Sequence, residues 1–246
     1  MWKARSIQVG WFVTNSSDVP VEKLFEALTD QEPDSYMKNR VPNPQFPFLS
    51  NATGVSDTEI NTINVEPGRV FWIIEPMVEV NDPPFPNLLN IKPTLGEIQN
   101  RIRGLDGDLL GETTRLTILS TLIFTMNSIV NVNRKLVKMC NITLNPEGLN
   151  ELQIRLNRRK KIKGGVEINR LANFSTVQSS LVMKNMQTGD EVLTNEKKYA
   201  VQVQLDFNTV PTGKVFSVKQ QQSIFQTLCN ETLIFVKNPH ISFFNK

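Results

Sequence analysis

The distribution of apolar residues marks three strands in the sequence. Apolar side chains recur at every second position in residues 6–13 and 198–207, which is the period of a strand with one buried face. Residues 113–126 form a longer, more apolar run and are predicted as a third strand.

A hairpin is predicted between residues 57 and 77. The turn-forming pair Pro67 and Gly68 separates two apolar runs there. Because residues 70–74 are apolar at every position, we expect the second strand of this hairpin to be covered on both faces.

Apolar residues spaced three and four positions apart predict four helices. Three of them have candidate N-terminal caps: Ser17 or Asp18, Thr94 with Glu97, and Ser217 with Gln220. The remaining helix is predicted over residues 128–140. The residues expected to face the core are Val21, Leu24, Phe25 and Leu28; Leu95, Ile98, Ile102 and Leu105; Ile129, Val132, Leu136 and Cys140; and Phe225, Leu228, Cys229, Thr232, Phe235 and Val236.

The C-terminal half is rich in strand-like segments. Strands are predicted over residues 149–158, 165–171 and 176–186, with turns at Gly164 and at residues 188–190. Short turns favour an antiparallel meander over parallel crossovers. The predicted fold class is therefore α+β, with a mostly antiparallel sheet packed by about four helices.

Proline-rich stretches are predicted as loops. Residues 31–49 are expected to form a long surface loop, whose aromatic residues Tyr36 and Phe46 are candidates for contacting a partner. Residues 1–246 are expected to form a single unit, with a subdomain seam near residues 81–93, where three prolines cluster.

Side chains suited to catalysis are scarce. The chain has one histidine, His240, and two cysteines, Cys140 and Cys229, both on predicted apolar helix faces. This composition favours a non-enzymatic protein without a metal or cofactor, and it supplies no candidate catalytic residue. Glu59, together with other acidic residues near the predicted hairpin, is expected to form a solvated rim, although a carboxylate site built from residues distant in sequence stays open.

The sequence also bears on the cellular setting. No stretch reaches the 18 or more apolar residues that a membrane-spanning helix needs. Two widely separated cysteines are typical of a protein in a reducing compartment, so a cytoplasmic location is expected.

Positive charge is concentrated in one region. Residues 134–170 contain ten Lys or Arg and three Glu, a local charge of +7 within a total of +3, which leaves −4 for the rest of the chain. The densest part, residues 155–163, is predicted to run from the end of a strand into a hairpin tip. Its candidate residues for an anionic partner are Arg155, Arg158, Arg159, Lys160, Lys161 and Lys163.

Several roles are open for this basic hairpin. It could neutralise the phosphates of a nucleic acid, an acidic protein surface or anionic lipid headgroups. It could also be a solvated turn that protects the edge of a sheet from aggregation. No aromatic residue lies among its cations, which weakens the case for stacking on unpaired bases.

Three stretches resemble a known family. Residues 65–72 (Val-Glu-Pro-Gly-Arg-Val-Phe-Trp), residues 152–158 and residues 168–175 are similar, in order and spacing, to uncharacterised bacterial cytoplasmic proteins of about this length. The resemblance implies a bacterial or phage origin and an α+β fold, and it brings no activity or site residues.

The functional expectation follows from these features. The favoured role is a non-enzymatic interaction protein, such as a sensor, adaptor or assembly component of a bacterial complex, including a defence system. Its expected partner is another protein or a second copy of the chain. The alternative is a nucleic-acid-associated protein that binds phosphates through residues 155–163.

Overall fold

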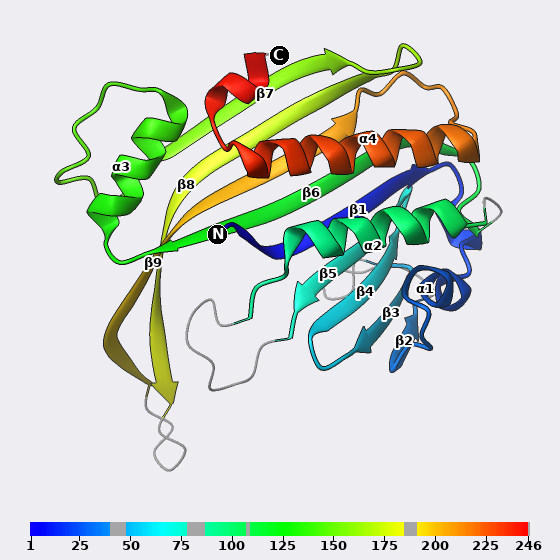
Figure 1. The fold of residues 1–246 in the computed structure, drawn as a ribbon. Helices are drawn as coiled ribbons and strands as arrows, with labels where there is room; N and C mark the ends of the chain where they lie inside the picture. Colours follow the sequence, from blue (N-terminus) through cyan, green and yellow to red (C-terminus); the bar gives the residue numbers. More distant parts are fainter. Residues whose placement is uncertain (40–47, 78–86, 107–108, 185–190, 246) are drawn as a thin grey trace.

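The computed structural model of the chain describes residues 1–39, 48–77, 87–106, 109–184 and 191–245, and only the backbone course for residues 180–184 and 191–196. Within these residues the chain forms one sheet of nine strands and four α-helices (Figure 1). Every strand pairing is antiparallel, so the predicted fold class is confirmed.

The strand order is β2-β3-β4-β5-β1-β6-β9-β8-β7. The strands are β1 (Lys3–Val13), β2 (Ser35–Lys38), β3 (Ser50–Val55), β4 (Glu59–Glu66), β5 (Arg69–Pro76), β6 (Thr113–Met126), β7 (Gln153–Lys161), β8 (Glu167–Lys184) and β9 (Glu191–Thr209). The helices are α1 (Val21–Thr29), α2 (Ile91–Gly104), α3 (Ile129–Cys140) and α4 (Val218–Lys237), with the short 3-10 turns η1 (Ser16–Asp18) and η3 (Ile241–Asn245). A subdomain seam was expected near residues 81–93, and strands that precede and follow these residues in the sequence belong to the same sheet. Residues 78–86 lie outside the described residues.

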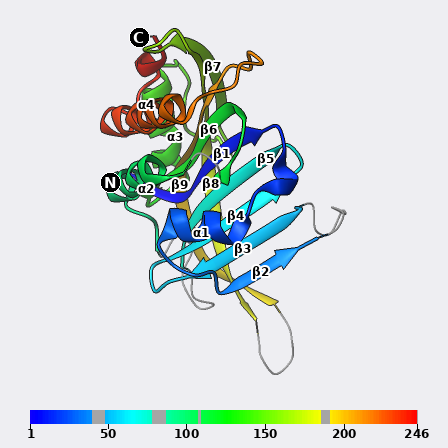
Figure 2. The same cartoon turned by 90° about the vertical axis from the view of Figure 1, so that its right-hand side faces the viewer.

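The described helices pack on one side of the sheet, which we call the helix face. Figure 2 shows α2, α3 and α4 together on that side, and α1 joins them through Phe25, which packs against Gly54 of β3. A Cβ atom at Gly54 would lie 2.6 Å from the Phe25 ring, so glycine allows this close approach. The opposite side, on which Gln8, Phe12 and Phe71 lie, carries no helix of the described chain; we call it the open face.

The core lies between the sheet and the helices. Apolar residues at alternate strand positions and on one side of each helix are buried there, among them Trp11, Trp72, Ile118, Phe207 and Phe225. The faces predicted for the helices are confirmed for most residues, whereas Ile129 and Val236 are only partly buried.

Two predicted helix caps are wrong. α1 begins after Pro20, and Ser17 and Asp18 belong to η1 instead. α2 begins at Ile91, three residues before Thr94, and Asn90 stands at its N-cap position. The capping box of Ser217 and Gln220 is confirmed at α4.

Other differences concern strands. The predicted loop over residues 31–49 contains β2, and β3 was not predicted. β8 is one continuous strand rather than two, and its expected turn at residues 188–190 lies outside the described residues. The expectation that β5 is covered on both faces is wrong: Val70, Trp72 and Ile74 are buried, whereas Phe71 and Ile73 lie half-buried on the open face.

Candidate functional site

The basic segment lies at one edge of the sheet. β7 is the last strand in the order and continues to Lys161, so most of the cations line a strand rather than a hairpin tip. Because side chains of a strand alternate between its two sides, Arg155, Arg159 and Lys161 lie on the open face, and Arg158 and Lys160 on the helix face. Lys163 alone of the six candidates lies in the turn before β8.

Two of the six candidate cations have acidic partners. Nζ of Lys160 lies 2.6 Å from Oε1 of Glu231 on α4, and Nη1 of Arg159 lies 3.6 Å from Oε2 of Glu167. Among the described residues, no carboxylate pairs with the four that remain, which are Arg155, Arg158, Lys161 and Lys163. They are exposed and can contact an anion without breaking an ion pair.

A row of facing residues crosses the open face from one edge to the other. Reading from β7 to β2, its members are Arg159, Asn169, Asn208, Thr117, Gly10, Phe71, Asn64, Asn51 and Met37. Five of these nine side chains are neutral hydrogen-bonding groups. Asn208 and Thr117 are buried, whereas Asn169, Asn64 and Asn51 are partly exposed and can contact a polar chain laid across the strands.

Hydrogen bonds fix the side chains near the middle of this row. Asn169 donates to Oδ1 of Asn208 at 3.0 Å, and Nη2 of Arg115 donates to the same oxygen at 2.9 Å. Asn208 in turn donates to Oδ1 of Asp206 at 2.8 Å, and Thr117 donates there at 3.0 Å. A positive guanidinium is thereby held on the open face three strands in from β7.

The cysteines do not contribute a nucleophile. Both are buried, which confirms the prediction that they belong to the core. Burial raises the pKa of the Cys140 thiol to about 11 and that of Cys229 to about 12, so both are protonated near neutral pH.

We expect neither cysteine of the folded chain to react with an alkylating reagent at pH 8, and both to react after denaturation. An unfolded thiol ionises near pH 8.5, well below the folded pKa values of about 11 and about 12. Above pH 8.5 the unfolded state therefore binds fewer protons, and the free energy of unfolding should fall as pH rises toward 11. Mass spectrometry of alkylated protein measures the first expectation, and rapid labelling of either thiol at pH 8 would contradict it.

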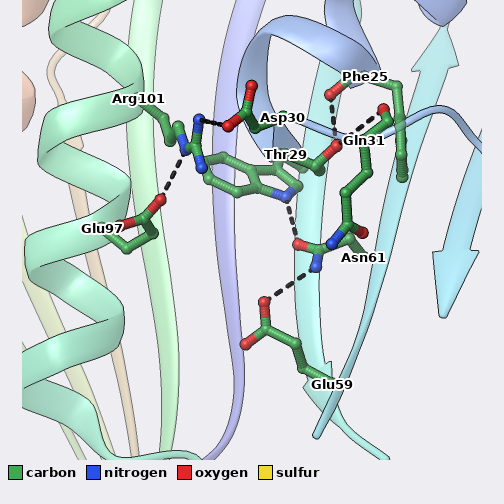
Figure 3. Close-up of polar contacts among 9 residues, drawn as sticks. Phe25, Thr29, Asp30, Gln31, Glu59, Asn61, Glu97 and Arg101 are labelled. Atoms are coloured by element: carbon green, nitrogen blue, oxygen red, sulfur yellow. Dashed lines mark hydrogen bonds and ion pairs between the residues drawn. The ribbon is translucent and has the colours of Figure 1, made fainter. Parts of the chain in front are cut away.

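The carboxylates of Glu59 and Glu97 line one small cavity, and Figure 3 shows the polar contacts of the residues around it. Trp72 Nε1 donates to Oδ1 of Asn61 at 2.9 Å, and Asn61 Nδ2 donates to Oε1 of Glu59 at 3.0 Å. Across the cavity, Nε of Arg101 pairs with Oε1 of Glu97 at 2.6 Å. The sequence suggested Glu59 as part of an acidic rim and Glu97 as part of a helix cap. It did not indicate that the two line one cavity, because they lie on different elements and 38 positions apart.

The cavity is too small for a substrate, and the polar cluster around it stabilises the fold. Its volume is about 80 Å³, far below the several hundred Å³ typical of ligand pockets. Arg101 also lies 3.5 Å from Asp30, the residue that ends α1, so the cluster joins α1, α2 and β4.

Neither a cluster of metal ligands nor a membrane-spanning helix is found in the part of the chain that the structure describes. Among the described residues, no group of three or more His, Cys, Asp or Glu is arranged to hold a metal ion. None of the described helices combines the length and the apolar character needed to cross a bilayer.

The chain was compared with models of protein families, with curated proteins and with solved structures. None of the three comparisons finds a match.

Proposed function

We propose that the chain is a non-enzymatic binding protein and that its ligand is a nucleic acid, held against β7 and the open face. The observation that carries this proposal is the set of exposed cations on β7 that have no acidic partner among the described residues, beside a row rich in neutral hydrogen-bonding side chains. Arg155 and Lys161 would contact phosphates. The partly exposed asparagines of the row, Asn169, Asn64 and Asn51, would contact sugars or base edges.

Protection of the sheet edge explains only part of this arrangement. Cations on an edge strand discourage pairing with another chain, and β7 fits that role. Arg115 lies on an interior strand, where there is no edge to protect, yet it presents a guanidinium on the same face. A polyanion that crosses several strands accounts for both positions.

Reversing the charge of two β7 residues tests the proposal. The double variant Arg155→Glu, Lys161→Glu should bind a labelled single-stranded oligonucleotide roughly tenfold more weakly or worse, because two phosphate contacts are lost. The slope of log affinity against log salt concentration should become shallower by about 1.4, since each contact contributes about 0.7 for single strands. Fluorescence anisotropy at several salt concentrations measures both quantities.

The matched control is Arg134→Glu. Arg134 is an exposed cation on α3, on the helix face, and its partner Glu147 is also exposed. This variant should bind nearly as tightly as the unchanged chain. Equal affinity and equal salt slope for the β7 variant and the unchanged chain would refute the nucleic-acid proposal.

A protein partner is the second candidate, and β2 is the feature that favours it. β2 pairs only with β3 in the described sheet, so its other edge offers backbone groups to a strand of another protein. Tyr36 and Met37 on this strand are 44% and 43% exposed, and Phe46 lies outside the described residues. If the oligonucleotide is not retained, this candidate takes precedence. The bacterial family, the cytoplasmic location, a defence role and oligomerisation stay predictions of the sequence.

A further inference from the structure

We infer that the open face selects single-stranded over duplex nucleic acid, by stacking unpaired bases on an array formed by Arg69, Phe71, Phe12 and Arg115. This inference rests on the proposed function, because it names the form of nucleic acid that the same surface would bind.

The array crosses three neighbouring strands. The guanidinium carbon of Arg69 lies 5.3 Å from the centre of the Phe71 ring, and that of Arg115 lies 4.8 Å from the centre of Phe12. The two rings meet edge to face, with their centres 6.4 Å apart. Two aromatic rings are thus flanked by two guanidinium planes on β5, β1 and β6.

Gly10 has no side chain, which leaves room for the Phe71 ring. A Cβ atom at this position would lie 2.9 Å from two ring carbons of Phe71 and 2.6 Å from Cγ2 of Thr117. Only glycine lets the ring lie over the β1 backbone without displacing these neighbours. The position of the ring is therefore specified by the sequence of a neighbouring strand.

The array differs from a core cluster in its surroundings. Phe12 and Phe71 are half-buried, and no described helix packs on this face. Arg69 is exposed, and the partly buried guanidinium of Arg115 is held in place by its hydrogen bond to Asn208. Exposed aromatic rings and guanidinium planes are the surfaces on which unpaired bases stack.

The array and the cations of β7 can be reached by one strand of nucleic acid. Phe71 and Arg159 belong to the same row of facing residues, with Gly10, Thr117, Asn208 and Asn169 between them. Five steps between adjacent strands at about 4.8 Å each separate them by about 24 Å. Phosphates at β7 and bases at β5 and β1 would then belong to one extended chain. The bases of a duplex are paired and stacked on each other, so they cannot reach these rings.

The double variant Phe12→Leu, Phe71→Leu tests this inference. Leucine retains an apolar side chain and removes the ring. Affinity for a labelled oligothymidine should fall roughly 5- to 150-fold, the range measured for loss of one stacked base, while affinity for a duplex of equal length should change less than twofold. Gly10→Ala, which keeps both rings but displaces Phe71, should weaken single-strand binding in the same direction.

Ile60→Ala is the control, because Ile60 is a partly buried apolar residue of β4 on the same face, away from the array. Thermal melting establishes that each variant is folded. Equal losses for single strands and duplex, or unchanged single-strand affinity in both array variants, would overturn the stacking inference. If the charge-reversed β7 variant still loses binding in that case, the proposed function survives. Absence of binding by the unchanged chain to either probe would overturn both.

Discussion

Replacing Glu231 with alanine is expected to lower the free energy of unfolding by about 3–5 kcal/mol, the usual result of removing one partner from a buried ion pair. Glu231 lies on α4 and is 5% exposed, and its Oε2 lies 3.4 Å from Nη1 of Arg170 on β8. Arg170 is 1% exposed, so its charge would remain in the core without the carboxylate that balances it. Lys160 would lose the same partner.

Chemical denaturation measures this effect, with Glu147→Ala as the control. Glu147 pairs with Arg134 at 3.4 Å, but both side chains are mostly exposed, so its loss should cost less than about 1 kcal/mol. Glu147→Ala removes one exposed ion pair, whereas Glu231→Ala removes the buried pair with Arg170 and also the pair with Lys160. The difference in stability between the two variants therefore reports mainly the buried charge of Arg170. Similar denaturation midpoints for the two variants would show that Arg170 is balanced by other groups.

The Arg170 cluster shows what the sequence could not predict. Its guanidinium also donates to the carbonyl oxygens of Phe243 and Phe244, more than 70 positions away. The alternation of β8 predicts that position 170 faces the core, but an arginine there fits a local pattern poorly. Only the tertiary structure supplies the carboxylate and carbonyl groups that make its burial tolerable.

The elements that the sequence predicted best are those with long local periodicity. Residues 113–126 were predicted as a strand and form β6 with the same bounds, because apolar residues dominate the whole run. β2 and β3 were not predicted, because their residues include Asn, Ser, Gly and Lys, which have low strand propensity. Pairing with β4 determines the conformation of β3, and pairing with β3 determines that of β2.

Only part of the candidate site could be predicted from the sequence. The cations of residues 155–163 are contiguous and could be found by inspection of the sequence. The aromatic residues were judged absent because the prediction considered only that segment, whereas Phe12 and Phe71 come from β1 and β5. Register between strands brings them onto one face with Arg115. That register depends on pairings between residues 61 positions apart, such as Gly10 and Phe71, and 103 positions apart, such as Phe12 and Arg115.

A second large loss of stability is expected for Phe235→Ala, about 3–5 kcal/mol, because the truncation leaves a cavity in a cluster of rings. Phe235 is fully buried on α4. Its ring centre lies 6.0 Å from that of Phe174 on β8, 5.5 Å from that of Phe243 and 6.1 Å from that of Phe244. The residue therefore joins the helix, the sheet and η3 at one point.

Ile234→Ala provides a control on the adjacent residue of the same helix. Ile234 is 53% exposed, so its truncation should change stability by less than about 0.5 kcal/mol, and both variants place alanine in the same helical context. The difference between their denaturation midpoints then measures packing of the Phe235 ring rather than helix propensity. Because Arg170 lies 5.1 Å from the centre of the Phe243 ring, Phe235→Ala and Glu231→Ala act on the same cluster. Their combined loss should be smaller than the sum of the single losses, and strict additivity would argue that α4 and η3 are held to β8 by independent contacts.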